Sequence, residues 1–138
     1  MHDSMRALPV RLRPRQDLRG ALEAVLAEQG VQAGFVLQGI GSLSVARIRF
    51  AGVDEITELR GDLEILTLSG SLSSDGVHLH ISVADAAGRV VGGHVAAGCI
   101  VRTTAEILVA LLPDRAFSRE ADAESGWDEL VIRTAARS

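Results

Sequence analysis

Three of the four histidines in the chain, His78, His80 and His94, fall within one stretch between Gly76 and Glu106. Because His78 and His80 are two positions apart, they leave the same face of a β-strand. Imidazole binds zinc and similar metals through one ring nitrogen, and three such ligands leave a fourth position open, where a bound water can become acidic. If His94 lies on the same face, the histidines predict an open metal site. The alternative is three ordinary hydrogen-bonded histidines.

The position of His94 depends on the turn that joins the two arms of this stretch. Residues 85–89 (DAAGR) fit a three-residue hairpin loop with Gly88 in the left-handed conformation. Counted back along the strands, this loop sets His80 opposite His94. A two-residue loop would pair Leu79 with His94 and turn His94 to the other face, since a one-residue slip inverts facing. The loop sequence favours the first register, so we expect three imidazoles on one patch of sheet.

Several other residues could take part in chemistry at such a site. Cys99 is either a fourth ligand or, as the alternative, a small buried hydrophobic side chain. Glu106, Glu64 and Asp85 are candidate acid–base groups, and Arg102 is a candidate clamp for an anion. The alternative for each of these charges is a solvated group or a structural ion pair, and Asp85 is most simply the residue that begins the turn. Sequence spacing alone connects none of them to the histidines.

Two further motifs have more ordinary interpretations. Gly92-Gly93 lacks both the GxGxxG pattern and the Walker lysine, so we expect it to let another backbone or a ligand approach the sheet closely. Residues 11–15 (RLRPR) faintly resemble a minor-groove hook, but a basic strand end leading into a helix is the favoured interpretation. A net charge of −4 argues mildly against nonspecific attraction to nucleic acid, although a local basic patch could override it. An aromatic content of 3% is too low for a base-stacking platform.

The N-terminal part of the chain is predicted to hold one strand and one helix. Residues 5–13 alternate loosely in polarity, and Pro9 is typical of an edge strand. Asp17 is a suitable N-cap, apolar residues recur at helical spacing over residues 18–26, and Gly30 supplies the C-terminal stop. We therefore expect a helix of about three turns with one buried face.

The rest of the chain is predicted to be β-structure. Residues 34–50 indicate two short arms with a bulge or tight bend at Gly39 and Gly41. Residues 63–72 carry apolar side chains on both faces, which predicts that both faces are covered, one by the helix and the other by another subunit. The alternative is a twist or bulge that swaps the faces midway along the segment. The remaining expectations are a weak strand at 55–59, a turn at Gly61-Asp62, a hairpin at 76–95, a strand at 100–112, a polar loop at 114–127 and a final strand at 129–133.

Length and composition indicate one small domain. A chain of 138 residues can bury roughly 68% of its unfolded surface. The hydrophobic content of 47% and mean hydropathy of +0.23 are high, yet no apolar run approaches a membrane span, so the surplus predicts surface buried between subunits. One cysteine excludes a disulfide within the chain, and the N-terminus does not resemble a signal peptide. We expect a cytoplasmic protein with no membrane association.

Three segments together resemble the PPC (plants and prokaryotes conserved) domain. They are residues 61–72 (GDLEILTLSGSL), 76–109 with its HLHIS, GGHV and TAEI motifs, and 117–130 (FSREADAESGWDEL). The resemblance implies a stand-alone bacterial domain over residues 5–133, with flexible termini at 1–4 and 134–138. It also implies an α+β fold, a mainly antiparallel sheet flanked by one or two helices, and assembly as a homotrimer.

The resemblance implies two function hypotheses of different classes. The first is a DNA-binding or regulatory module; the plant proteins of the family contact DNA through AT-hooks, and their GRFEIL segment for partner binding corresponds here to residues 61–66 (GDLEIL). The second is a metal-dependent lyase or hydrolase that acts on a small anionic molecule near the histidines. PPC proteins are similar in fold to acetolactate decarboxylase, whose HxH motif and later histidine hold zinc. His78, His80 and His94 match that arrangement.

Overall fold

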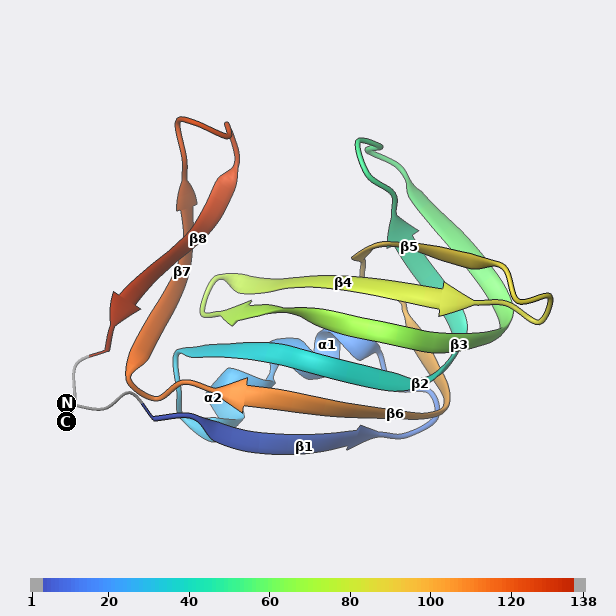
Figure 1. The fold of residues 1–138 in the computed structure, drawn as a ribbon, viewed down its shortest axis with the longest axis horizontal. Coiled ribbons are helices and arrows are strands. Elements are labelled where there is room, and N and C mark those ends of the chain that lie inside the picture. Colours follow the sequence, from blue (N-terminus) through green and yellow to red (C-terminus); the bar gives the residue numbers. More distant parts are fainter. Residues whose placement is uncertain (1–3, 136–138) are drawn as a thin grey trace.

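Antiparallel pairing between neighbouring strands organises most of this chain (Figure 1). The computed structural model describes residues 4–135. It confirms the predicted α+β fold, with a mainly antiparallel sheet and one bent helix. The predicted flexible termini, residues 1–4 and 134–138, fall largely outside the described residues. The elements in chain order are β1 (Arg6–Leu12), α1 (Leu18–Glu23), α2 (Val25–Gln29), β2 (Ala33–Arg49), β3 (Ile56–Ser73), β4 (Gly76–Ala84), β5 (Val90–Val95), β6 (Ile100–Leu111), β7 (Arg115–Ala121) and β8 (Asp128–Thr134).

Six strands form the main sheet in the order β1-β6-β2-β3-β4-β5. The last two residues of β2, Ile48 and Arg49, also pair with β5, so the sheet partly closes on itself. This closure requires β2 and β3 to be long and bent, and they have 17 and 18 residues. Gly41 of β2 has a φ of 144°, and a Cβ there would lie 2.1 Å from the Thr104 carbonyl oxygen of β6. Only glycine therefore allows β2 to bend this close to β6.

Two sequence predictions in this region are wrong. The two predicted arms of residues 34–50 form one continuous strand, β2. The predicted bulge or bend is present as shifts in the register of β2 with β3 and β6. The predicted turn at Gly61-Asp62 lies inside β3, which also absorbs the predicted weak strand. Gly61 has a φ of 133°, so this glycine marks a bend within a strand rather than its end.

The helical segment has the predicted boundaries. The Asp17 side chain accepts hydrogen bonds from the backbone N–H groups of Arg19 and Gly20, and Gly30 ends the segment in the left-handed conformation with a φ of 68°. A break at Ala24 divides the segment into α1 and α2. Figure 1 shows both helices behind the sheet, where they cover one face.

The core lies between these helices and the face of the sheet that they cover. Alternation along β4 places Val77, Leu79, Ile81 and Val83 in this core and leaves His78 and His80 on the opposite, exposed face. The largest fully buried side chains come from α1 and five strands: Leu18, Leu22, Val36, Leu43, Ile48, Leu68, Leu72, Leu79, Val83, Val95, Val101 and Leu111. No helix within residues 4–135 combines the length and the apolar character needed to cross a bilayer.

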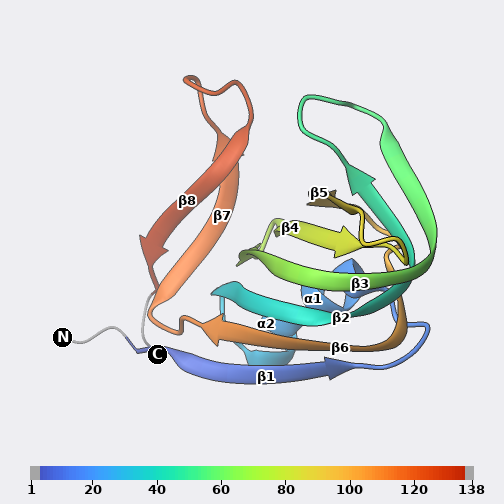
Figure 2. The same ribbon diagram turned by 45° about the vertical axis from the view of Figure 1, so that its right-hand side comes forward.

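The second sheet is a hairpin of β7 and β8 (Figure 2), and β7 is joined to the residues beside the main sheet by a bridge between Ala116 and Gln32. The predicted polar loop at 114–127 is therefore wrong, because β7 occupies its first half. Phe117 is the buried residue of β7, and its ring meets that of Phe35 edge-on with centroids 5.6 Å apart. The other side chains of β7 are half-buried or exposed, and most of them are polar. The sequence of β7 therefore lacks the apolar alternation that predicts a strand.

Candidate metal centre

The β4–β5 hairpin has the turn that its sequence predicts. The Asp85 N–H donates to the Arg89 carbonyl and the Gly88 N–H to the Asp85 carbonyl, each at 2.9 Å, and Gly88 has a φ of 77°. The loop is thus the three-residue type, and His80 stands opposite His94 in the ladder. The Asp85 side chain accepts bonds from the backbone of Arg89 and of Ala87, and these bonds, with the Arg89 guanidinium, lower the pKa of this carboxyl. Asp85 is therefore a turn residue.

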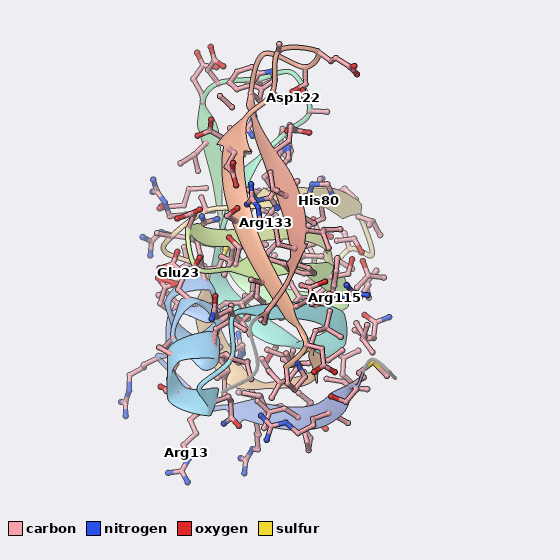
Figure 3. The ribbon with its side chains drawn as sticks, turned by 90° about the vertical axis from the view of Figure 1, so that its left-hand side faces the viewer. Arg13, Glu23, His80, Arg115, Asp122 and Arg133 are labelled. Atoms are coloured by element: carbon pink, nitrogen blue, oxygen red, sulfur yellow. The ribbon has the colours of Figure 1, made fainter. Side chains whose placement is uncertain are left out.

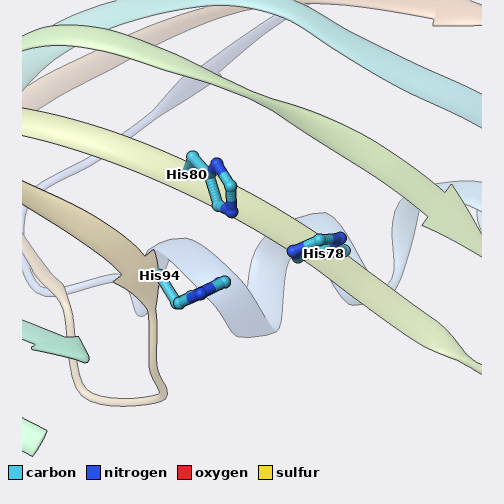
Figure 4. Close-up of side chains that lie close together, drawn as sticks. All are labelled: His78, His80 and His94. Carbon is cyan, nitrogen blue, oxygen red and sulfur yellow. The ribbon is translucent and has the colours of Figure 1, made fainter. Parts of the chain in front are cut away.

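The three imidazoles converge on the exposed face of this hairpin (Figure 4). One nitrogen of each ring can be chosen so that all three lie within 4.8 Å of one another. The His80 ring meets the other two edge-on, with centroids 4.9 Å from His78 and 4.6 Å from His94. The rings of His78 and His94 lie nearly parallel, with an interplanar angle of 16° and centroids 5.5 Å apart. His78 and His80 are exposed and His94 is half-buried, so the cluster opens to solvent.

The cluster sits where β4 and β5 separate. Their ladder ends at the His80–His94 pair, so His78 lies beyond the last rung. Arg19 of α1 fills the gap: its guanidinium donates to the Val95 carbonyl at 2.8 Å and to the Val77 carbonyl at 3.2 Å. These two carbonyls belong to the neighbours of His94 and His78. Arg19 therefore sets the spacing between the two strands that carry the cluster.

The glycine pair before His94 has the close-approach role predicted from the sequence. A Cβ on Gly92 would lie 2.7 Å from the Ile81 carbonyl oxygen of β4. A Cβ on Gly93 would lie 2.5 Å from the Arg49 carbonyl oxygen and 2.9 Å from Ile48 Cγ2, both of β2. The absence of side chains lets β5 fit between β4 and the returning half of β2. His94 is held in place by this double pairing.

The surroundings favour neutral imidazoles in two of the three histidines. Burial lowers the pKa of His78, and the positive charge of Arg119 lowers it further. Burial also lowers the pKa of His94, with a second contribution from Arg49. A neutral imidazole has the free nitrogen lone pair that a metal requires, so both environments favour the ligating form.

Two arginines that the sequence analysis missed border the cluster. Arg49 of β2 is the cross-strand partner of His94. Arg119 of β7 donates from its guanidinium to the Ser71 hydroxyl at 2.6 Å, and Ser71 is the cross-strand partner of His78. Both arginines come from elements distant in sequence from the histidines. Their signals would have been the β2–β5 pairing and the strand character of β7, neither of which periodicity reveals.

The residues proposed from the sequence as helpers lie outside the cluster. Cys99 is fully buried, exchanges hydrogen bonds with the backbone of Arg47, and has a pKa raised by burial, so it is the small hydrophobic side chain of the alternative interpretation. Arg102 pairs with Asp62. Glu64 and Glu106 are exposed on β3 and β6. Within residues 4–135, the group of side chains that is close enough to hold a metal ion contains the three histidines and no carboxylate or thiol.

Comparison with known proteins decides the family. A family model described as the Plants and Prokaryotes Conserved (PCC) domain matches residues 1–113. The chain belongs to this family, which is the PPC family that its sequence motifs resemble. Two curated relatives, both called Bifunctional protein GlmU and from two Synechococcus strains, are 50% identical over 135 and 133 residues. The PCC chain covers only 22% and 21% of their lengths.

Solved structures share the PCC fold. A hypothetical protein from Salmonella enterica is 37% identical, with a TM-score of 0.94 and 99% of each chain covered. The metal-containing protein AF0104 from Archaeoglobus fulgidus is 28% identical, with a TM-score of 0.77 and coverage of 91% of this chain and 93% of that one. Proteins from Bacteroides thetaiotaomicron and Ralstonia eutropha, each called a putative DNA-binding protein, are 23% identical, a level that shows the fold alone.

Proposed function

We propose that this PCC domain binds a divalent transition metal, zinc in the first instance, through His78, His80 and His94. The observation that carries the proposal is the approach of three ligating nitrogens to within 4.8 Å of one another on one exposed face. The archaeal relative described as metal-containing, at 28% identity, supports it.

The donor set and its spacing fit such a metal. Zinc–imidazole bonds of about 2.0–2.1 Å limit two nitrogens on one ion to about 4 Å, so the present separations need only a small rotation of the rings. His78 and His80 are exposed and can make that rotation without disturbing the core. When bound, a zinc ion with three protein ligands supplies a Lewis acid with an open position for water or for a chelating ligand.

The test is element analysis of the purified protein together with a zinc titration. We expect one zinc ion per chain in the wild type and loss of stoichiometric binding in His80→Ala, which removes the central ring of the cluster. His2→Ala, a change at the fourth histidine of the chain, is the matched control and should retain the metal. A metal-free wild-type protein that takes up no zinc or cobalt would overturn the proposal.

We propose two uses for such a centre. It could serve a metal-dependent enzyme acting on a small anionic molecule, a class supported by the open side of the cluster and by the neighbouring arginines. It could instead serve a regulatory module that binds DNA. This use is supported by the descriptions of two proteins of the same fold and by the exposed arginines of β1, Arg6 and Arg11.

A mobility-shift assay across a salt series separates these uses. DNA binding through the arginines of β1 predicts a complex at low salt that weakens steeply as salt rises, because each phosphate contact releases counterions. Arg6→Gln combined with Arg11→Gln should then reduce the affinity and the salt slope. Absence of a complex at about 50 mM salt would exclude the DNA-binding use.

The homotrimer implied by family resemblance is also a proposal. It is supported by exposed apolar residues on the face of the sheet that the helices leave open: Leu37, Ile40, Leu66 and Leu108. A groove of about 520 Å³ lies on the same face and includes Ile40 and Leu108. Analytical ultracentrifugation should find a trimer that Leu108→Glu dissociates, while the exposed-site control Val90→Glu should leave it intact. A monomeric wild type would contradict this proposal.

A further inference from the structure

We infer that the ligand of this metal centre is a small oxyanion, a carboxylate or a phosphate, held between the metal and the guanidinium groups of Arg119 and Arg49. The inference rests on the metal-binding function proposed above. It assigns the chemical class of the ligand and the side chains that recognise it.

Arg119 is held beside the cluster by the packing of β7 against the β3–β4 turn. Its backbone N–H donates to the Asp75 carboxylate at 2.9 Å, and the Phe117 carbonyl two residues earlier accepts a bond from Ser74. From this anchored position the guanidinium reaches the Ser71 hydroxyl at 2.6 Å, directly across the ladder from His78. One of its N–H groups is used in this bond, which leaves other N–H donors for a ligand.

Arg49 reaches the cluster from β2. It is the cross-strand partner of His94 in the short β2–β5 pairing. Its guanidinium donates to the Val53 carbonyl at 3.3 Å, a long bond to a neutral acceptor. Its side chain is half-buried, as is that of Arg119. The two arginines thus border the two histidines that lie nearly parallel at either end of the cluster, His94 and His78.

Arg49 and Arg119 combine partial burial with the absence of a carboxylate partner, whereas Arg6 and Arg11 of β1, which also lack one among the described residues, are exposed. Arg19, which also lies close to the cluster, pairs with Glu23 at 2.9 Å. Carboxylates also pair with five further arginines: Arg47, Arg60, Arg89, Arg102 and Arg133. Within residues 4–135, no carboxylate pairs with Arg49 or Arg119, although both are partly withdrawn from water. A half-buried guanidinium without a counterion is suited to receive one.

The charge balance of the site indicates the same class of ligand. Arg119 and Arg49 already bring two positive charges beside His78 and His94. A divalent cation on the imidazoles would add two further positive charges, and no carboxylate belongs to the ligating group among the described residues. An anion that binds the metal through one oxygen and a guanidinium through another neutralises both. Planar guanidinium groups match carboxylate and phosphate oxygens bidentately.

The test is a titration of the cobalt-loaded full chain with oxalate and, separately, with inorganic phosphate. Cobalt replaces zinc at such sites, and its visible absorption reports a change at the open coordination position. Removal of a charge-assisted hydrogen bond should weaken binding about ten- to a hundredfold in Arg119→Gln and in Arg49→Gln. The oxalate and phosphate series identify which oxyanion the site prefers. Desalting and element analysis after each titration verify that cobalt stays on the protein.

The control variant is Arg13→Gln. It removes the same unit of charge from an exposed arginine that Figure 3 places far from His80, and it should leave both affinities unchanged. Arg119→Lys keeps the charge and loses the planar fork, so its affinity should lie between those of the wild type and Arg119→Gln.

The outcomes separate this inference from the proposed function. Failure to load cobalt or zinc would overturn the metal-binding function, and the oxyanion site with it. Stoichiometric metal with oxalate and phosphate affinities that do not depend on Arg119 or Arg49 would overturn this inference alone. If Arg119→Gln fails to fold, Arg119→Lys and Arg49→Gln still decide the question, because the two arginines lie on different elements.

Discussion

Replacing Gly93 by alanine should displace β5 and with it one side of the histidine cluster. The added Cβ would lie 2.5 Å from the Arg49 carbonyl oxygen, whereas ordinary contact begins at 3.4 Å, so the two strands must separate by about 0.9 Å. Ile48 cannot move aside easily, because it is fully buried and its Cγ2 would lie 2.9 Å from the new atom. Overpacking of this kind costs about 1–3 kcal/mol of unfolding free energy.

The same displacement should weaken metal binding. His94 follows Gly93 directly, and metal sites tolerate errors of only about 0.2 Å in their ligand distances. We therefore expect the zinc affinity of Gly93→Ala to fall about tenfold or more, in the range found for groups that position ligands.

Urea denaturation followed by circular dichroism measures the first effect, and a zinc titration the second. Gly20→Ala in α1 is the matched control: its Cβ would meet only the Asp17 side chain, at 3.7 Å, and a helical Gly→Ala change should raise stability by about 0.5–1 kcal/mol. A Gly93→Ala protein as stable as the wild type, with unchanged zinc affinity, would refute the conclusion that β5 is held between β4 and β2.

Three further predictions concern residues around the site and the turn before α1. Arg19→Met leaves the Val77 and Val95 carbonyls without the guanidinium donor. The unfolding free energy from urea denaturation should therefore fall by about 1–2 kcal/mol, and the zinc affinity should fall about tenfold. Unchanged values would show that Arg19 does not space the strands. Since the folded-state pKa values of His78 and His94 lie below the ordinary 6.5, the unfolded chain binds more protons there. The stability of the metal-free protein should therefore fall as pH drops below about 6.5, and zinc should be released only below that pH. Zinc release that begins above pH 6.5 would contradict the lowered pKa values of these histidines. Arg15 has a φ of 76°, so Arg15→Gly should leave stability unchanged or raise it by up to about 1 kcal/mol in the same assay, and a clear loss would contradict strain at this position.

The sequence predicted the histidine pairing because a local rule determines it. The turn type follows from the residues of segment 85–89, and once the turn is known the register of the hairpin follows by counting. The N-cap at Asp17 and the stop at Gly30 were predictable for the same reason, since each depends on a few neighbouring residues. Local chemistry sufficed for these features.

Features that depend on contacts distant in sequence were missed. The bend in β3 at Gly61 resembles a turn in sequence, and only the long pairing with β2 shows that the strand continues. Strand β7 was taken for a loop because its environment is mostly solvent, with Phe117 as its apolar anchor. Arg49 and Arg119 were missed as a consequence, since their proximity to the histidines requires the closure of the sheet by β2 and the packing of β7.

The two edges of the main sheet differ in their pairing, and this difference limits how copies of this chain can associate. At one margin β5 already pairs with β2 over part of its length, while at the other β1 has a neighbour, β6, on one side only. An open margin invites strand addition and aggregation, but Pro9 in the middle of β1 has no N–H to offer, and Arg6 and Arg11 flank it with like charges. Continuous growth by edge-to-edge pairing is therefore discouraged, so self-association should stop at a closed assembly formed through the sheet face.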